Sequence, residues 1–549
     1  MRALPLLVLA ACASQPPAGT LRFANQDPVW QVADRTPLPK EPAEREYFRT
    51  LYHIDGFAVR RATRAMDMPD PVRAADVNAL DEVPDSTWFV NRIGVRDLAV
   101  EEIRRGPNVD PSPFDHRPWT ITGAKVGGTA LGFVFEDARG EKYLLKFDVA
   151  NVPEMETGAH MIGHRLVWAM GYNVPQDFLG YIRRQDLVIS PEATKKSAGK
   201  KTPLLATDVD EALAKMYRTG DGRFRVLASK YLPGKPIGPY AREGVRKDDP
   251  NDRIPHERRR SLRGQIAPFS WLNHTDMQED NTLDAFVRHP GPDGKKSDHG
   301  HVVHYLIDFG KALGVMGYVN YWKTIGYTYR FDIGMAARSL VTLGLWKRPW
   351  DDISAPQIVG IGLFSAEGFD PGRWRANSQY WPYEDADRFD GFWGAKLVMR
   401  FTRAHIEAAV AEAQFSDPRA SQHMIEVLLE RQRRIGAYWF AQVSPLDRFE
   451  VRERRLCFDD LALVYGLESA RDRRVIVEAF DGDGRRLTPR TATSAAANRC
   501  IDVPASGATD GYTIVKLASL RGRKSLPPVL VHLARDARGE LRVSGIRRQ

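Results

Sequence analysis

The sequence predicts an α+β chain that ends in a small all-β domain. Apolar residues recur at helical spacing over Thr402 to Gln414 and over Ser421 to Gln442. After Arg452 to Arg455 the pattern changes to short apolar strands separated by glycine-containing turns. We therefore expect a β-sandwich or barrel over residues 451–549. Its predicted strands are Arg474 to Phe480, Thr513 to Leu517, Val529 to Leu533 and Leu541 to Ile546.

Length and composition indicate a globular protein of several domains. The chain has 549 residues, of which 43% are hydrophobic and 27% charged, so it has enough apolar material for more than one core. Its net charge of +9 suits an anionic partner such as a phosphate ester or an acidic lipid surface. That excess is small over so long a chain, so we do not expect nucleic acid as a partner.

The N-terminus has the features of an export signal. Arg2 precedes the apolar run Leu4 to Ala11, which ends in small residues just before Cys12. A run of this length falls far short of the roughly 20 residues of a membrane-spanning helix. We predict a signal peptide over residues 1–11.

The tetrad Leu9-Ala10-Ala11-Cys12 resembles the lipobox of bacterial lipoproteins. The resemblance implies cleavage before Cys12 and lipid attachment to its thiol; the alternative is an ordinary signal peptide with a chance cysteine. Ala13 stands where such lipoproteins often carry an Asp for inner-membrane retention. The resemblance therefore implies a lipid-anchored protein of the cell envelope, on the outer membrane and facing the periplasm. Residues 12–46, which contain QPPAG and PLPKEPAE, are predicted to form a tether.

Cys457 and Cys500 are the only other cysteines of the chain. Both lie in the predicted all-β domain, and two cysteines in one small domain of an exported protein could form a disulfide. Two unpaired buried thiols are the alternative, because the sequence gives no distance between them.

A glycine-rich hairpin and a lysine-bearing strand open the middle of the chain. Trp119 to Asp148 reads as strand, glycine-rich turn, strand, turn and strand, with Lys146 among apolar neighbours in the last strand. Gly127, Gly128 and Gly132 belong to the first turn. Taken alone, such a lysine points to solvent and glycines are common in hairpins.

A helix is predicted to follow, from Met155 to Gly171, where Gly171 ends the apolar stripe. Glu154 and Glu156 lie at its start. Glu156 could reach back to the ammonium of Lys146. Alternatively, both carboxylates simply favour the N-terminal end of the helix dipole.

The strongest motif is His274-x-Asp276-x-x-x-x-Asn281, followed after a hairpin-like insertion by Asp308-Phe309-Gly310. The first element resembles the catalytic loop of protein kinases and their relatives, and the second resembles their metal-binding DFG element. The resemblance implies a two-lobed kinase-like fold. Its β-rich small lobe, with an N-terminal extension, would cover residues 47–240, and its helical large lobe residues 241–450.

The resemblance also implies a role for each matching residue and ATP and Mg²⁺ as cofactors. Asp276 would accept or orient the proton of the substrate hydroxyl, while Asn281 and Asp308 would hold Mg²⁺ through hard oxygen atoms. Lys146 would contact the nucleotide phosphates under the turn that contains Gly127, Gly128 and Gly132, and Glu156 would hold Lys146 in place.

Several departures point to a divergent branch. Thr275 replaces the Arg of the kinase HRD element, no clear APE follows Asp308-Phe309-Gly310, and only ten residues separate Lys146 from Glu156, so that Glu154 or a later residue is an alternative partner. The chain is therefore more similar to atypical kinases, such as the spore-coat CotH-like or HipA-like groups, than to ordinary Ser/Thr kinases.

These features predict a metal-dependent phosphotransferase that acts on a protein, glycan or lipid head group of the envelope. Two alternatives stay open. Nucleoside triphosphate is scarce outside the cytoplasm, so the domain could be a scaffold or binding module without catalysis. The same residues could also transfer a nucleotidyl group.

Two further clusters are ambiguous. The run from Arg258 to Arg263 precedes the catalytic loop and is either a solvated helix face or an electropositive rim. His299, His301 and His304 lie in a polar insertion, and we interpret them as loop or strand histidines rather than metal ligands.

Overall fold

The computed structural model has a mixed α and β architecture, as the sequence predicts. The chain divides into two compact units. Unit 1 contains the described part of Met1–Val29 together with Asn78–Glu82 and Phe440–Gln549, and unit 2 contains Trp30–Val77 and Val83–Trp439. The structure describes residues 22–66, 72–124, 132–197, 200–291, 296–316, 324–330, 332–348, 350–508 and 510–549.

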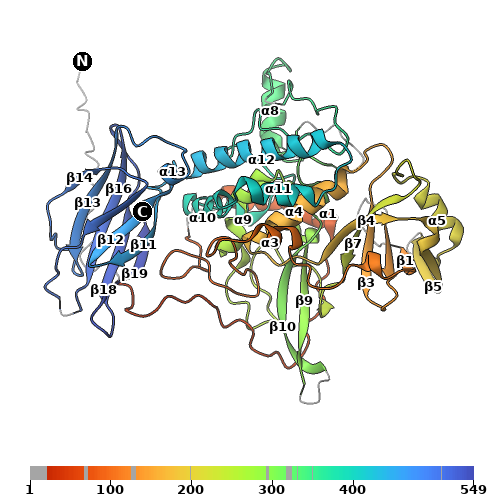
Figure 1. Ribbon diagram of the computed structural model, residues 1–549, viewed down its shortest axis with the longest axis horizontal. Coiled ribbons are helices and arrows are strands. Elements are labelled where there is room, and N and C mark those ends of the chain that lie inside the picture. Colours follow the sequence, from red (N-terminus) through yellow and green to blue (C-terminus); the bar gives the residue numbers. More distant parts are fainter. Residues whose placement is uncertain are drawn as a thin grey trace. The chain divides into compact units, whose positions relative to one another are not determined.

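Unit 2 contains a seven-stranded sheet with the order β4-β7-β3-β2-β1-β5-β6 (Figure 1). Neighbouring strands are antiparallel except β1 and β5, which are parallel. Successive side chains of a strand point to opposite faces, so Tyr143, Leu145 and Phe147 enter one core while Lys146 points to the other face. The strands are β1 (Trp119–Ala124), β2 (Gly132–Glu136), β3 (Lys142–Phe147), β4 (Asp177–Ile182), β5 (Leu187–Ser197), β6 (Lys200–Pro203) and β7 (Phe224–Lys230).

The remainder of unit 2 consists of helices, a smaller sheet and long loops. The expected helices at Thr402 to Gln414 and Ser421 to Gln442 are confirmed, with bounds a few residues different, and Thr402 caps the first by accepting the backbone N–H of His405. The helices are α1 (Arg49–Ile54), α2 (Arg60–Met66), α3 (Val100–Arg105), α4 (Met155–Met170), α5 (Ala206–Leu213), α6 (Arg260–Arg263), α7 (Ile266–Trp271), α8 (Ile333–Val341), α9 (Trp381–Glu384), α10 (Arg388–Met399), α11 (Arg403–Ala411) and α12 (Pro418–Trp439).

A long hairpin follows the predicted catalytic loop. It consists of β9 (Thr282–Pro290) and β10 (Lys296–Leu306), and β8 (Lys235–Pro236) pairs with β9 (Figure 1). The register places Thr282 opposite Leu306 at the open end of the hairpin. The residues just before β9 and just after β10 are therefore brought side by side.

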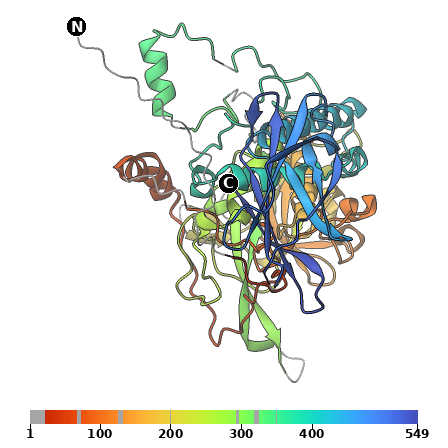
Figure 2. The same cartoon turned by 90° about the vertical axis from the view of Figure 1, so that its left-hand side faces the viewer.

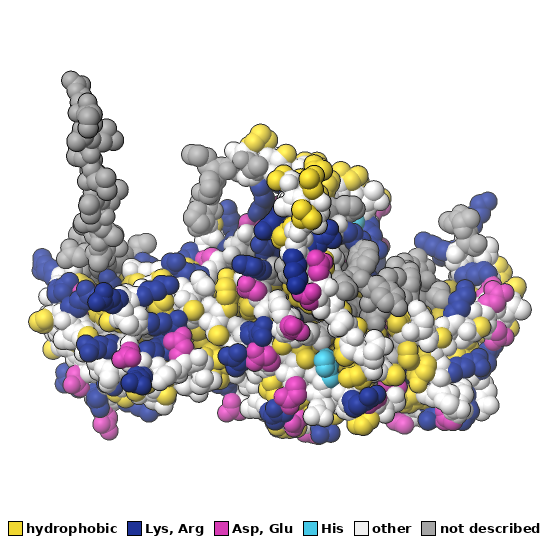
Figure 3. Space-filling view, turned by 90° about the horizontal axis from the view of Figure 1, so that it is seen from above, with side chains coloured by type: hydrophobic (Ala, Val, Ile, Leu, Met, Phe, Trp, Pro, Cys, Tyr) yellow, Lys and Arg dark blue, Asp and Glu magenta, His cyan; other side chains and the backbone are white. Residues whose placement is uncertain are grey.

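Helix α8 projects from the rest of unit 2 in both ribbon views (Figures 1 and 2). Hydrophobic side chains gather on this projecting part when it is seen from above (Figure 3), among them the exposed Leu340 and Val341. Met335 and Arg338 of this helix, together with residues before and after it, line the pocket considered below.

The segment from Trp30 to Glu46 belongs to unit 2 and contacts the β9–β10 hairpin and the loop before it. Leu38 is buried and donates its backbone N–H to the carbonyl of Gly300. Arg45 forms an ion pair with Glu279, with 2.7 Å between Nη2 and Oε2.

Unit 1 is built mainly from two antiparallel sheets that share one apolar core. Strands are found at all four positions that the sequence predicts for this region. One sheet has the order β11-β12-β15, the other β14-β13-β16-β18-β19, with β17 on β16. The elements are β11 (Leu446–Arg452), β12 (Arg455–Asp460), α13 (Leu461–Val464), β13 (Arg473–Asp481), β14 (Thr491–Ser494), β15 (Asn498–Asp502), β16 (Thr513–Arg521), β17 (Lys524–Ser525), β18 (Val529–Arg535) and β19 (Leu541–Arg548).

Two further contacts tie distant parts of unit 1 together. Cys457 of β12 and Cys500 of β15, a cross-strand pair, are joined by a disulfide with 2.03 Å between the sulfur atoms. Phe23 donates its backbone N–H to the Tyr512 hydroxyl at 2.8 Å, so the N-terminal segment is also attached to this unit.

Candidate active site

Lys146 is buried in the sheet of unit 2 and meets a residue 162 positions away. Its Nζ lies 2.9 Å from Oδ1 of Asp308, and its side chain is 9% exposed. Strand β3 is held on both sides, with Gly132 of β2 and Leu227 of β7 opposite Lys146. Burial alone would lower the pKa of Lys146, but the Asp308 carboxylate and, more weakly, Glu156 raise it. The ammonium is therefore charged and fixed.

Glu156 lies beside this ion pair because the start of α4 is anchored to the end of β3. Asp148 accepts the backbone N–H groups of Glu156 and Thr157, both at 3.0 Å, and the Thr157 hydroxyl at 2.6 Å. Burial, followed by the negative charge of Asp308, raises the pKa of Glu156 to about 7. Carboxyl groups whose pKa is raised in this way are common in functional sites.

The alternative partner, Glu154, points elsewhere. It is buried and its carboxylate accepts the backbone N–H of Ser416 at 2.8 Å. Glu156 instead approaches the turn after Asp308, since a Cβ atom on Gly310 would lie 2.7 Å from Cγ of Glu156. The turn therefore leaves room for Glu156 only because residue 310 is glycine.

Asp276 and Asn281 lie in the loop that follows α7. The side-chain amide of Asn281 donates to the backbone carbonyl of Asp276 and to its Oδ2, the latter at 3.2 Å. The backbone N–H of Ile307 donates to the carbonyl of Asn281 at 3.0 Å. The β9–β10 register thus places Asn281 beside the segment that carries Asp308.

Phe309 connects the loop to helix α4. Its ring lies 5.6 Å from the His274 ring and 5.7 Å from the His160 ring, measured between centroids. Burial lowers the pKa of His274 to about 4, so this imidazole is neutral at pH 7. His274 therefore packs the loop against the turn and does not act as a cation.

Lys311 is a site residue that sequence reasoning missed. Its Nζ lies 2.9 Å from Oδ2 of Asp276, and its side chain is 20% exposed. Burial opposes its charge, but Asp276, Asp308 and Glu156 raise its pKa. The only signal in the sequence is that a lysine directly follows Asp308-Phe309-Gly310. The sequence does not show that the folded turn brings this lysine to Asp276.

Within the described residues, the site therefore brings together two lysines, three carboxyl groups and one amide: Lys146, Lys311, Glu156, Asp276, Asp308 and Asn281. Gly132 is the first residue of β2 and lies opposite Lys146. Gly127, Gly128 and Cys12 lie outside the described residues.

The donor set fits Mg²⁺ better than a softer ion. Among the described residues, no group of three or more His, Cys, Asp or Glu side chains is arranged to hold a metal. Mg²⁺, however, takes only one or two protein oxygen ligands and completes its shell with water and phosphate. Asp308 would offer a carboxylate oxygen and Asn281 its side-chain oxygen. The amide nitrogen of Asn281 is the atom that faces Asp276.

The arginine run has a structural role that the sequence did not indicate. Arg259 pairs with Asp252 at 2.8 Å and Arg260 with Asp390 at 3.1 Å, and both arginines are buried. A solvated face and an electropositive rim are therefore both wrong for the buried arginines Arg259, Arg260 and Arg263, whereas Arg258 is exposed. The acidic partners lie up to 130 residues away along the chain, which is why the pattern could not show them.

The histidine cluster lies on strand β10, in line with the interpretation as strand residues. His304 is buried, bonded to Asp284 at 2.6 Å and stacked on Trp88. His301 contacts His289 at 2.8 Å between ring nitrogens.

No family model, curated protein or solved structure matches this chain. In the part of the chain that the structure describes, no helix has both the length and the hydrophobicity required to cross a membrane.

Proposed function

We propose that this cluster is the nucleotide and metal site of a phosphotransferase with a kinase-like, two-lobed arrangement. The observation that carries the proposal is the contact between Lys146 and Asp308, at 2.9 Å and 162 residues apart. Asp276 and Asn281 belong to the same cluster. A buried group of mutually compensating charges costs stability relative to an apolar core, so its presence favours a chemical role.

The order of the elements supports a kinase-like arrangement. An antiparallel hairpin, β1 and β2, is followed by the lysine strand β3 and by helix α4 with Glu156 at its start. The loop with Asp276, the turn with Asp308 and the helices α10, α11 and α12 come later. This is the order that the resemblance in the sequence implies.

Phosphoryl transfer depends mainly on orientation and on neutralising phosphate charge. Asp308 and Asn281 would hold Mg²⁺, which supplies charge neutralisation at the phosphates of ATP when it is bound. Lys146, held by Asp308 and Glu156, presents a fixed ammonium to the phosphates. Asp276 orients the acceptor hydroxyl and receives its proton.

Lys311 adds a second cation to this scheme. Its ammonium lies 2.9 Å from Oδ2 of Asp276, the carboxylate that the proposal assigns to the acceptor hydroxyl. A phosphate group that enters the site would compete with Asp276 for the Lys311 ammonium and so release the carboxylate for the acceptor.

The acceptor is a hydroxyl group of an envelope or exported component: a protein, a glycan or a lipid head group. This part of the proposal depends on the lipoprotein signal at Cys12. The protein would then be lipid-anchored at the outer membrane and face the periplasm.

Two alternatives follow from the same residues. A catalytically silent scaffold would keep the fold and bind nucleotide or a partner without transfer. A nucleotidyl transferase would use the same lysine and metal ligands but transfer the α-phosphate group.

The test is transfer from ATP labelled at either the α- or the γ-phosphate, with Mg²⁺ and an envelope extract as acceptor. Incorporation of the γ-label that is lost in Asp308→Asn supports the proposal, and incorporation of the α-label supports nucleotidyl transfer. Asp298→Asn, at a side chain that is 90% exposed, is the matched control. Metal-dependent binding of ATP without transfer of either label would support the scaffold and contradict the proposal.

A further inference from the structure

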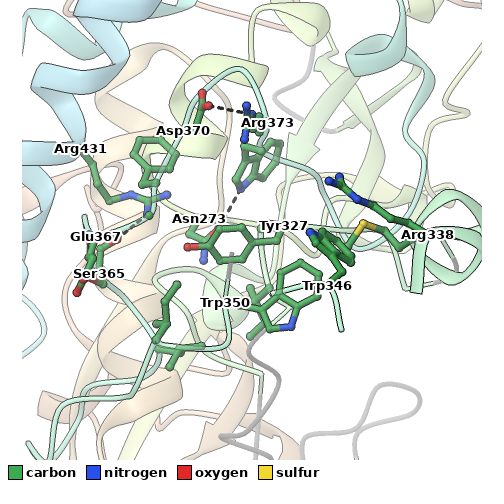
Figure 4. A pocket seen from close by; sticks show the side chains of 18 residues that line it. Asn273, Tyr327, Arg338, Trp346, Trp350, Ser365, Glu367, Asp370, Arg373 and Arg431 are labelled. Carbon is green, nitrogen blue, oxygen red and sulfur yellow. Dashed lines mark hydrogen bonds and ion pairs between the residues drawn. The ribbon is translucent and has the colours of Figure 1, made fainter. Parts of the chain in front are cut away.

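Unit 2 contains a pocket of about 410 Å³ that the proposed phosphate chemistry does not use. Its volume lies in the range of ~300–1,000 Å³ that is typical of small-molecule sites. The lining comes from the loop before Asp276, from the segment that follows Phe309 and from helix α12 (Figure 4).

One wall of the pocket is aromatic. The rings of Tyr327 and Trp350 lie 5.7 Å apart, and those of Trp350 and Trp346 lie 6.3 Å apart, measured between centroids. Trp350 is buried at 7% exposure, while Trp346 and Tyr327 are partly exposed. In Figure 4 these three rings stand together on one part of the pocket. Trp350 also packs with Ile353 and Leu363, so this wall of the pocket is apolar as well as aromatic.

The remaining lining mixes apolar side chains such as Ile353, Leu363 and Phe369 with charged ones, among which cations are in excess. Arg338, Arg373 and Arg431 line the pocket with two acids, Glu367 and Asp370. Asp370 is already paired with Arg373 at 3.3 Å. Arg338 lies over the Trp346 ring at 4.4 Å, on the side of the view opposite Arg431 (Figure 4).

Arg431 is buried. Within the described residues, its guanidinium forms no ion pair with a carboxylate. It donates three of its five N–H groups to the backbone carbonyls of Trp271, Ser365 and Ser270 and lies on the Phe369 ring at 3.6 Å. Burial lowers its pKa to about 9, which still leaves it charged at pH 7.

The pocket is joined to the loop that carries Asp276. Asn273 lines it and accepts the indole N–H of Trp374 at 3.0 Å. Asn377 donates its backbone N–H to the carbonyl of Thr275 at 2.7 Å. Asn273 precedes Asp276 by three residues, a span of at most about 11 Å.

We propose that this pocket binds the acceptor of the transferase, and that the acceptor is an acidic saccharide. Aromatic planes suit the C–H faces of sugar rings, and the surrounding amide and charged groups suit their hydroxyls. Arginine is the side chain best matched to a carboxylate or phosphate substituent. This inference rests on the proposed function, because it places the acceptor next to Asp276.

The test measures saccharide binding to the full chain in the absence of nucleotide. Tryptophan fluorescence and calorimetry report the affinity. The probe is a tetrasaccharide that contains glucuronic acid, with cellotetraose as the neutral probe and a phosphorylated glucose disaccharide as the second anionic arm. We expect the acidic saccharides to bind at least tenfold more tightly than cellotetraose. The acidic probe that binds more tightly shows whether the pocket prefers a carboxylate or a phosphate substituent.

Two variants locate the site. Trp346→Ala should weaken binding of the acidic tetrasaccharide about tenfold, the loss expected for one aromatic contact. Arg338→Ala, at an exposed side chain that the fold does not need, should reduce the preference for the acidic over the neutral probe. Trp30→Ala, at a tryptophan that is 44% exposed and outside the pocket lining, should leave the affinity unchanged.

Several outcomes would overturn the inference: no binding of any saccharide, equal binding of acidic and neutral probes, or binding that Trp30→Ala weakens as much as Trp346→Ala. Binding of Mg²⁺ and ATP is measured separately. If ATP binds and the saccharides do not, the pocket assignment is wrong and the proposed function stands. If the saccharides bind and ATP does not, the pocket is a saccharide site and the phosphotransferase is wrong.

Discussion

Two contacts in this protein join segments that are far apart in the sequence, and they do so in opposite ways. Cys457 and Cys500 are linked covalently across neighbouring strands of unit 1, 43 residues apart. Lys146 and Asp308 of unit 2 are linked by an ion pair across 162 residues. The first sits beside an apolar core and the second in a cluster of charges.

The contrast leads to an expectation: the disulfide serves stability and, under the proposed function, the ion pair serves chemistry. A disulfide stabilises the folded state mainly because it lowers the conformational entropy of the unfolded chain. The attraction within a buried ion pair barely offsets the free energy needed to remove two charges from water. Apolar residues at the same positions would therefore stabilise the fold more. The predictions below separate the two cases.

The largest expected effect is on transfer activity in unit 2. Lys146→Met should reduce the proposed metal-dependent transfer by about 10³-fold, or ~4 kcal/mol, because it removes a fixed cation from the proposed phosphate site. Lys142→Met, on the same strand at a side chain that is 56% exposed, is the control and should keep its activity. Comparable losses in both variants would show that the strand, and not the ammonium of Lys146, matters.

Stability should respond far less to the same change. Asp308 has 32% of its side chain exposed, so water can replace part of the lost contact. We expect the free energy of unfolding of Lys146→Met to fall by no more than about 2 kcal/mol, measured by urea denaturation. A larger loss would make the cluster structural.

The reverse pattern is expected for the disulfide of unit 1. Closing a loop of 43 residues stabilises a folded domain by up to about 4 kcal/mol in the chain-entropy model. The double variant Cys457→Ser, Cys500→Ser should lose this stability and keep the transfer activity of unit 2. Reduction of the native protein should have the same effect. A loss of transfer in the double variant would mean that the two contacts are coupled.

Parts of this comparison could be predicted from sequence. The four strands of unit 1 and the helices that became α4, α11 and α12 follow from apolar periodicity and from end signals such as Gly171 and Thr402. The motif with Asp276, Asn281 and Asp308 could be singled out because its resemblance to kinase motifs depends on short spacings along the chain.

Other parts depend on tertiary contacts that spacing does not contain. The burial of Arg260 could not be predicted, because its partner Asp390 lies 130 residues away along the chain. Lys311 is an ordinary lysine until the turn after Asp308 places it on Asp276. The pocket is assembled from Asn273, Trp350 and Arg431, which no pattern connects.

Acidification should weaken unit 1 through His532. This histidine is buried in β18, and burial together with the nearby Arg547 lowers its pKa to about 4. Its unfolded value is about 6.5, so the unfolded state takes up a proton first as the pH falls. The stability that the neutral form contributes is complete above pH ~6.5 and is lost between pH ~6.5 and ~4, by up to about 3 kcal/mol.

Hydrogen exchange of the β16 and β18 amides measures this loss, after correction for the intrinsic rates. His532→Phe should flatten the pH dependence in this window, although it removes the partner of the Tyr512 hydroxyl. His299→Phe, at an exposed histidine of unit 2, is the control and should leave the slope in unit 1 unchanged. An unaltered slope in His532→Phe would assign the acid sensitivity to carboxylates.

The smallest expected effect returns to the ionic cluster. In Gly310→Ala the new methyl group would lie 2.7 Å from Cγ of Glu156, so the Glu156 side chain must move and Lys146 loses part of its support. Since the atoms that must give way belong to a side chain and not to the backbone, the fold should tolerate the change, and transfer should fall about tenfold with little effect on stability. Gly220→Ala, where a Cβ atom meets nothing within 4 Å, is the control. If Gly310→Ala lowers stability and activity together, the turn after Asp308 is a packing element; if activity alone falls, Glu156 positions Lys146, and the ionic contact serves chemistry while the disulfide serves stability.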